Sequence, residues 1–288
     1  MLMSGLYCGL DNNARSSDTA LKGESTVYPG GKNGGGAYQT IINLMPPHSV
    51  YIEPFLGSGA VMRMKRPAKV NIGLDLDGEA LAIARAAIVA EHAGTRWQFE
   101  RRDGVAFLAA LSVGGSEPPV NGSELVYCDP PYVMSTRRSG KLYKHEFTDG
   151  DHQRLLFVLK QLPCMVMISG YESNMYGAWL RDWNAIQYQA MTRGGSQANE
   201  WVWFNFPAPV ALHDYRYLGK NFRERERIKR KKARWTARLE RMPVLERQSL
   251  LAAIEAFSAR TGDGGSEIGG SGDAAESSKM AGPAGIDE

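Results

Sequence analysis

The stretch VYIEPFLGSG (residues 50–59) decides the fold, because it joins a short apolar run to a glycine turn. Residues 50–55 have the length and composition of a buried strand. Gly57 and Gly59 follow, and we expect a helix to begin near Ala60. Such a turn lets backbone amides approach a ligand, and the helix N-terminus favours an anionic group. A tight turn without a ligand would use the same residues, and the pattern is shorter than the G-x-G-x-x-G fingerprint, which disfavours NAD.

The same alternation of strand and helix continues along the chain. Short apolar runs at 70–75, 124–129 and 164–169 indicate strands, and 201–206 indicates a late strand that we expect to be antiparallel. Residues 78–92 and 151–162 have helical spacing between these runs. This order predicts an α/β domain with a mainly parallel sheet, helices on both faces, and ligands at the carboxyl ends of the strands.

Two acidic residues lie at the ends of other predicted strands. Asp75 ends the run at 70–75 and could accept hydrogen bonds from ribose hydroxyls. Capping of the helix that starts near Gly78 is an equally plausible role, and Asp77 could take either one. Asp103 follows a strand at WQFE (97–100) and could reach an adenine amino group. Together with the glycine turn, these strand ends predict a nucleoside-binding edge of the sheet.

The segment Asp129-Pro130-Pro131-Tyr132 directly follows the apolar strand LVYC. The prolines stiffen the turn, so the Asp129 carboxylate and the Pro130 carbonyl can be held as two fixed acceptors. Such a pair could hold an aromatic amino group and stabilise charge that develops on its nitrogen. Tyr132 offers a face on which a base can stack. The alternative is a proline-stiffened surface turn.

Three motifs then stand in the order and spacing of a known family: YPGGK (28–32), EPFLGSG (53–59) and DPPY (129–132). From about Tyr28 to Phe206 the chain resembles the Dam-like DNA adenine methyltransferases, in particular phage or prophage members. DHQRLLFVLKQL, MVMISGY and NEWVWFNF also resemble later segments of that family. The resemblance implies a Rossmann-like class I sheet and S-adenosylmethionine as the cofactor.

The resemblance also implies residue roles. Lys32 is expected near the methionine carboxylate of the cofactor, with Tyr28 packing beside it. Asp75 is expected to bind the ribose and Asp103 the adenine. The remaining cofactor-lining residues are Glu53, Phe55, Gly57, Ser58 and Gly59. The catalytic turn that holds the target base is Asp129, Pro130, Pro131 and Tyr132.

One departure from the family concerns target recognition. Family members often carry a recognition insertion before the DPPY strand, but here only residues 104–123 separate Asp103 from that strand. The segment 134–144 is a candidate replacement, with Tyr143 among basic residues that suit phosphate contacts. An exposed lid loop without DNA contact is the alternative. The predicted DNA contacts in this segment are Arg137, Arg138, Lys141 and Lys144.

A second candidate is a basic block near the C-terminus. The chain has 288 residues and a net charge of +3, but residues 220–247 hold twelve Lys or Arg against four Glu. This asymmetry suggests a polyanionic partner, here double-stranded DNA, with Arg227 and Arg230 as contacts. A solvated helix face is the alternative. We expect two helices, the second with a buried face formed by Leu250, Leu251, Ile254 and Phe257.

These patterns predict a leader at 1–26, a catalytic domain at 27–218, a basic helical hairpin at 219–261 and a disordered tail at 262–288. Three widely spaced cysteines give neither a metal site nor a disulfide framework. No stretch reaches the roughly 20 apolar residues that span a bilayer. We therefore expect a soluble monomer in a bacterial cytoplasm, without a metal.

The expected reaction is methylation of the exocyclic amino group of adenine in duplex DNA. Cytosine methylation at its amino group is chemically close, and an RNA base or a protein amide nitrogen could use the same polar turn. A DNA-binding module with a vestigial active site is the non-enzymatic alternative.

Overall fold

The computed structural model describes residues 32, 36–92, 95–113, 122–137, 143–191 and 197–262. The chain divides into two compact units, residues 1–225 and 226–288, and each is considered by itself. The predicted leader, Tyr28, Arg138, Lys141 and nearly all of the predicted tail lie outside the described residues.

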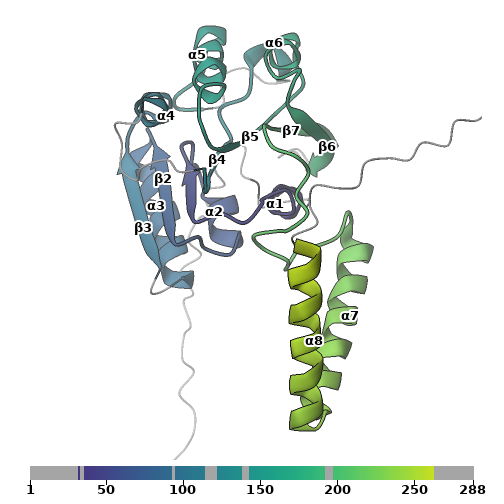
Figure 1. The fold of residues 1–288 in the computed structure, drawn as a ribbon. Helices are drawn as coiled ribbons and strands as arrows, with labels where there is room; N and C mark the ends of the chain where they lie inside the picture. Colours follow the sequence, from purple (N-terminus) through teal and green to yellow (C-terminus); the bar gives the residue numbers. More distant parts are fainter. Residues whose placement is uncertain are drawn as a thin grey trace, which may run out of the picture. The chain divides into compact units, whose positions relative to one another are not determined.

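The first unit is built on a seven-stranded sheet with the order β3-β2-β1-β4-β5-β7-β6 (Figure 1). The strands are β1 (Val50–Glu53), β2 (Val70–Asp75), β3 (Arg96–Arg101), β4 (Glu124–Cys128), β5 (Met165–Gly170), β6 (Asn184–Met191) and β7 (Gln197–Phe204). The first five are parallel, and β7 is antiparallel to both β5 and β6. The predicted antiparallel late strand is confirmed, whereas β6 was not predicted.

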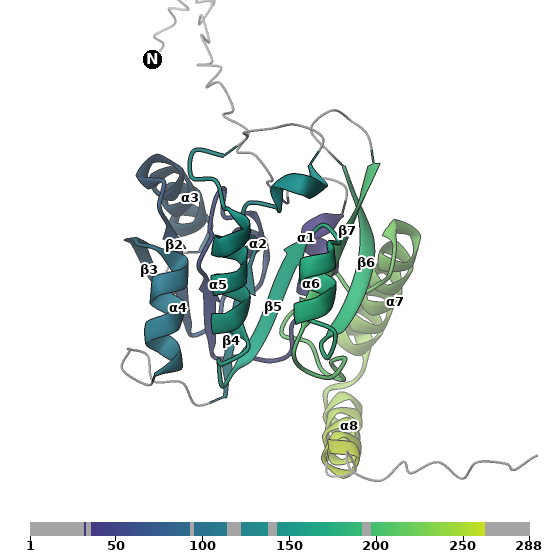
Figure 2. The same ribbon diagram turned by 90° about the horizontal axis from the view of Figure 1, so that it is seen from above.

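Helices cover both faces of this sheet (Figure 2). They are α1 (Ala37–Ile42), α2 (Ala60–Met64), α3 (Gly78–Glu91), α4 (Gly104–Ser112), α5 (Asp149–Leu159) and α6 (Asn174–Trp179), with a short 3-10 helix, η1 (Met134–Thr136). Tyr51 of β1 packs into the core with α1, α2 and α3, while the next residue, Ile52, packs into the core with α4, α5 and α6. Burial on both sides explains why the parallel strands are almost continuously apolar. The predicted α/β class is confirmed.

The carboxyl ends of β1, β2, β3 and β4 meet at one edge of the sheet. Helix α2 begins at Ala60, as expected, after a turn in which Gly57 and Gly59 have φ values of 50° and 65°. Residues other than glycine are strained in this left-handed region. The Leu56 amide donates to the Leu74 carbonyl at 2.8 Å, which ties the turn to β2. Glycine is therefore required for the conformation of this turn.

Gly104→Ala tests how closely the start of α4 must approach this turn. A Cβ at Gly104 would lie 2.4 Å from the Pro54 carbonyl oxygen, a backbone atom that cannot rotate away. We expect the substitution to lower the free energy of unfolding by about 1–3 kcal/mol through overpacking. Urea denaturation measures it.

Gly177→Ala in α6 is the matched control, because a Cβ there meets no atom within 4 Å. Alanine is the better helix former, so this variant is expected to gain about 0.5–1 kcal/mol. Equal stability changes in the two variants would contradict the close approach.

The second unit contains most of helix α7 (Phe222–Arg241) and helix α8 (Val244–Gly262), joined by Met242 and Pro243. The prediction of a buried apolar face on the second helix is wrong for the described residues. Ile254 is 50% exposed and Phe257 59%, Leu251 is also exposed, and Leu250 is half-buried. Periodicity identifies an apolar face but not what covers it. No helix in the described part of the chain meets the length and apolarity needed to span a membrane.

Candidate functional site

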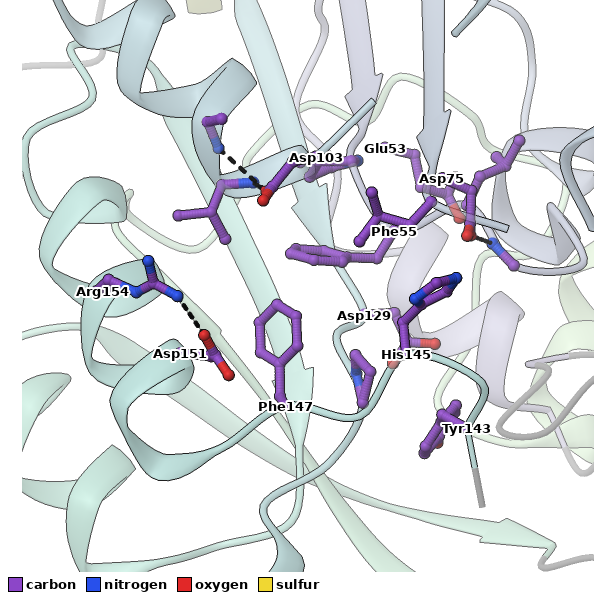
Figure 3. A pocket seen from close by; sticks show the side chains of 18 of the residues that line it. Glu53, Phe55, Asp75, Asp103, Asp129, Tyr143, His145, Phe147, Asp151 and Arg154 are labelled. Carbon is purple, nitrogen blue, oxygen red and sulfur yellow. Dashed lines mark hydrogen bonds and ion pairs between the residues drawn. The ribbon is translucent and has the colours of Figure 1, made fainter. Parts of the chain in front are cut away.

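A cavity of about 630 Å³ opens at the carboxyl edge of the sheet (Figure 3). Among its lining residues are nine of those predicted from the sequence: Lys32, Glu53, Phe55, Gly57, Ser58, Asp75, Asp103, Asp129 and Pro131. Gly59, Pro130 and Tyr132 do not line it directly. Residues from four strand ends thus converge although up to 76 positions separate them in the chain, from Glu53 to Asp129.

Asp75 holds the glycine turn in place. Its Oδ2 accepts a hydrogen bond from the Gly57 amide at 2.7 Å, and its Oδ1 accepts one from the Asp77 amide at 2.8 Å. Burial raises the pKa of Asp75 despite these two bonds. Asp77, not Asp75, caps α3, because its carboxylate accepts the Glu79 amide at 3.1 Å. Of the two roles that the sequence left open, the capping of α3 therefore falls to Asp77.

Asp103 caps α4 at the cavity wall. Its Oδ1 accepts the amides of Val105 at 2.8 Å and Ala106 at 3.2 Å. The Phe55 and Phe147 rings meet edge to face beside it, with centroids 5.4 Å apart. A cap, two aromatic rings and a carboxylate make this end of the cavity suitable for a flat heterocycle with an amino group.

Asp129 follows β4 and is held by two neighbours. Its Oδ1 lies 3.0 Å from the Lys32 ammonium and accepts a hydrogen bond from the Ser169 hydroxyl at 2.8 Å. Burial raises the pKa of Asp129, although Lys32 opposes the shift. The carboxylate is therefore fixed in orientation at the base of the cavity.

Sequence reasoning missed the second carboxylate of this group, Glu200 on β7. Its Oε2 lies 3.1 Å from the Lys32 ammonium and accepts the hydroxyls of Tyr132 at 2.9 Å and Tyr188 at 2.6 Å. Lys32 also contacts the Tyr132 hydroxyl. Burial would raise the pKa of Glu200, but Lys32 and the hydroxyls outweigh it, and the pKa is lowered. The available signal was a glutamate directly before the apolar run WVWFNF (201–206).

Lys32 therefore lies between two carboxylates, the half-buried Asp129 and the buried Glu200. Burial by itself would lower its pKa, yet Asp129, Tyr188 and Glu200 raise it well above the ordinary value. Lys32 remains a cation in this setting. We define Lys32, Asp129, Tyr132, Tyr188 and Glu200 as the Lys32 network.

The segment after the catalytic turn is only partly described. The Arg137 side chain is 3% exposed, pairs with Glu146 at 2.6 Å and donates to the Tyr132 carbonyl. It braces the DPPY turn and does not face solvent. Lys144 is 63% exposed and pairs with Asp77 at 3.1 Å. Arg227 and Arg230 are exposed on α7.

Glu53→Gln is expected to change how stability depends on pH. Burial raises the pKa of Glu53 to about 8, so between pH 4.5 and 8 the folded chain binds more protons here than the unfolded chain. In the wild type, the contribution of Glu53 to the free energy of unfolding therefore falls as pH rises through that window. The variant has no such loss and accepts the Tyr51 hydroxyl through its amide oxygen.

The stability of the variant relative to wild type should increase from pH 5 to pH 7 by at most about 1.4 kcal/mol per pH unit. Urea titrations at the two pH values measure this difference. A difference independent of pH would show that Glu53 is ionised in the folded chain.

A family model described as D12 class N6 adenine-specific DNA methyltransferase matches residues 117–193. This segment contains β4, the DPPY turn and β5. Over these residues the match confirms the resemblance to DNA adenine methyltransferases, though not to phage or prophage members, and it agrees with S-adenosylmethionine as the cofactor. In the chain, no group of three or more His, Cys, Asp or Glu is placed to hold a metal among the residues that the structure describes.

Several solved structures match part of the chain at low sequence identity. An rRNA methylase from Streptococcus thermophilus is 12% identical, covers 58% of this chain and 93% of its own, and has a TM-score of 0.39. A conserved hypothetical protein from Streptococcus pyogenes is 15% identical, with coverages of 62% and 99% and a TM-score of 0.41. Magnesium protoporphyrin IX methyltransferase from Synechocystis, with bound S-adenosylmethionine, is 12% identical, with coverages of 59% and 76% and a TM-score of 0.38. No curated protein sequence matches the chain.

Proposed function

We propose that this protein transfers a methyl group from S-adenosylmethionine to the exocyclic amino group of adenine in duplex DNA. The observation that carries the proposal is the Asp129 carboxylate, fixed between Lys32 and Ser169 at the base of the cavity and followed by two prolines and Tyr132. The family match over residues 117–193 supports adenine as the base and DNA as the polymer. We include a monomeric state and the bacterial cytoplasm in the proposal.

The residues of the cavity fit the cofactor. Asp75 and the glycine turn suit a ribose, and Asp103 beside Phe55 and Phe147 suits an adenine. Lys32 also lines the cavity, and its positive charge suits the carboxylate of the methionine part. The cavity volume of about 630 Å³ lies within the range of small-molecule sites.

The cofactor supplies an electrophilic methyl group on a sulfonium. Asp129 and the Pro130 carbonyl accept the two amino hydrogens of the target base, so they orient the nitrogen and stabilise the positive charge that develops there. No base is needed before the attack, and the amino nitrogen releases its proton afterwards. Fixed acceptors and proximity then supply most of the rate.

The target base must leave the duplex stack to reach Asp129, at a cost of a few kcal/mol. Tyr132 is 7% exposed, and its hydroxyl is held by Glu200. Its ring also meets Tyr171 edge to face, with centroids 4.7 Å apart. We propose that this tyrosine pair forms the wall against which the flipped base stacks, which offsets part of the unstacking cost.

The test is incubation with labelled S-adenosylmethionine and duplex DNA, followed by digestion and mass analysis of the nucleosides. N6-methyladenine is the expected product. Methylation at the cytosine amino group would show that cytosine, not adenine, is the target base. Methyl groups found only on RNA or protein would overturn DNA as the substrate class. Failure to bind the cofactor together with salt-sensitive DNA binding would favour a module with a vestigial site.

A further inference from the structure

The part of helix α7 in the second unit carries five arginines along one side. Arg227, Arg230, Arg234, Arg238 and Arg241 follow one another at intervals of three and four residues, and all five are exposed. At about 100° per residue these intervals keep the five side chains within one side of the helix, over a length of about 21 Å. We call this set the arginine stripe.

The positive charge of the second unit is concentrated on this helix. Within this unit α7 contains eight Lys or Arg against two Glu, whereas α8 contains two Arg against two Glu. Lys229 and Lys232 lie on the side of α7 opposite the arginine stripe, by the same angular spacing. Lys231 lies beside the stripe by the same spacing, so only Lys229 and Lys232 serve as a pair of lysines on the opposite side.

A surface depression lies at the C-terminal end of the arginine stripe. Arg234, Arg238 and Arg241 line a shallow depression of about 380 Å³ together with Met242, Pro243 and Glu246. The planar guanidinium group donates paired hydrogen bonds that match the oxygens of a phosphate, which a lysine ammonium does not. Three guanidinium groups around one hollow favour a phosphate-bearing partner.

Duplex DNA fits this surface better than a membrane does. A helix that lies on a membrane inserts its apolar side, and Ile228, Trp235 and Leu239 form that side of α7, about a third of a turn from the arginine stripe. A partner whose contact is centred on the arginine stripe therefore meets guanidinium groups and not apolar side chains. Duplex DNA presents one phosphate charge per about 1.7 Å of its axis, enough for every arginine of a 21 Å stripe.

We propose that the arginine stripe is a sequence-independent docking surface for the phosphate backbone of duplex DNA, separate from the catalytic cavity. The inference rests on the proposed function, because it takes DNA as the substrate polymer. Backbone contacts supply affinity and orientation without reading bases. Such a surface adds affinity for duplex DNA to a chain whose segment 104–123 is short, but it does not replace base recognition.

The experiment compares two full-length variants that lose the same charge from the same helix. Arg230→Gln with Arg234→Gln alters the arginine stripe, and Lys229→Gln with Lys232→Gln alters the opposite side. Binding of a fluorescein-labelled duplex is measured by anisotropy at several NaCl concentrations. Circular dichroism and cofactor affinity check that both variants remain folded.

We expect the stripe variant to bind duplex about 30-fold more weakly at 0.15 M salt and its logarithmic salt slope to fall by about 1.8, as expected for two lost phosphate contacts. The lysine variant should lose less than about threefold. Equal losses in the two variants would overturn the proposal, because they would show a general charge effect. Unchanged binding in the stripe variant would overturn it too.

Further arms separate this proposal from the proposed function. If wild type methylates duplex DNA while the stripe variant keeps the same KM for duplex, the docking surface fails and the methyltransferase stands. If wild type methylates no DNA but duplex binding still depends on the stripe, the docking surface stands and the proposed function fails. Stripe-dependent binding to phosphatidylserine vesicles or to duplex RNA, with none to duplex DNA, would overturn the docking proposal.

Discussion

Asp129→Ala is expected to lower the rate of methyl transfer by at least about 10³-fold while S-adenosylmethionine affinity stays within about threefold of wild type. The variant loses the acceptor that orients the amino group and opposes the charge on its nitrogen. Lys32 keeps Glu200 as a partner at 3.1 Å, so no buried cation is left unpaired. Single-turnover transfer and calorimetric cofactor binding measure the two quantities separately.

Ser169→Ala provides the graded comparison. It removes the hydroxyl that donates to Asp129 at 2.8 Å but leaves the carboxylate and its contact with Lys32. We expect a loss of about tenfold in the transfer rate, since one neutral donor is worth roughly 1–1.5 kcal/mol. Near-normal turnover in Asp129→Ala would refute the role assigned to Asp129.

Asp75→Ala is expected to weaken S-adenosylmethionine binding by about 10- to 150-fold, equivalent to roughly 1.5–3 kcal/mol for hydrogen bonds to a charged group. The variant loses the proposed ribose acceptor and the anchor of the Gly57 amide at 2.7 Å. Isothermal titration calorimetry measures the dissociation constant.

Asp77→Ala is the matched control, two residues away and of the same type. It removes the cap of α3 and should lower the free energy of unfolding by about 1 kcal/mol. Its cofactor affinity should match wild type, because Asp77 does not line the cavity. Comparable weakening of cofactor binding in the two variants would contradict the separate roles of these acids.

The sequence was sufficient for the parts of the fold that depend on neighbours in the chain. The strand predicted at 70–75 is β2, and the helix predicted near Ala60 is α2. The sequence also predicted that the acids at successive strand ends lie close together, because parallel strands end at one edge of a sheet. These predictions needed only periodicity, glycine turns and topology.

The parts that failed depend on distant partners. Tyr188 lies on β6, a strand that was not predicted, because its sequence NAIQYQAM is largely polar on one side and at the sheet edge. Without β6, nothing indicated that Tyr188 and Tyr132 would share Glu200. The prediction that the apolar face of α8 is buried failed for a related reason. The residues of a helix do not show which other element packs against it.

The Lys32 network also has a consequence for biosynthesis. Lys32 and Glu200 are 168 positions apart, and β7 pairs between β5 and β6, which both precede it in the chain. A nascent polypeptide emerging from the ribosome can form β1 to β5 while Lys32 still lacks one of its two counterions. The DPPY turn therefore reaches its final electrostatic state only after β7 has been translated and inserted into the sheet.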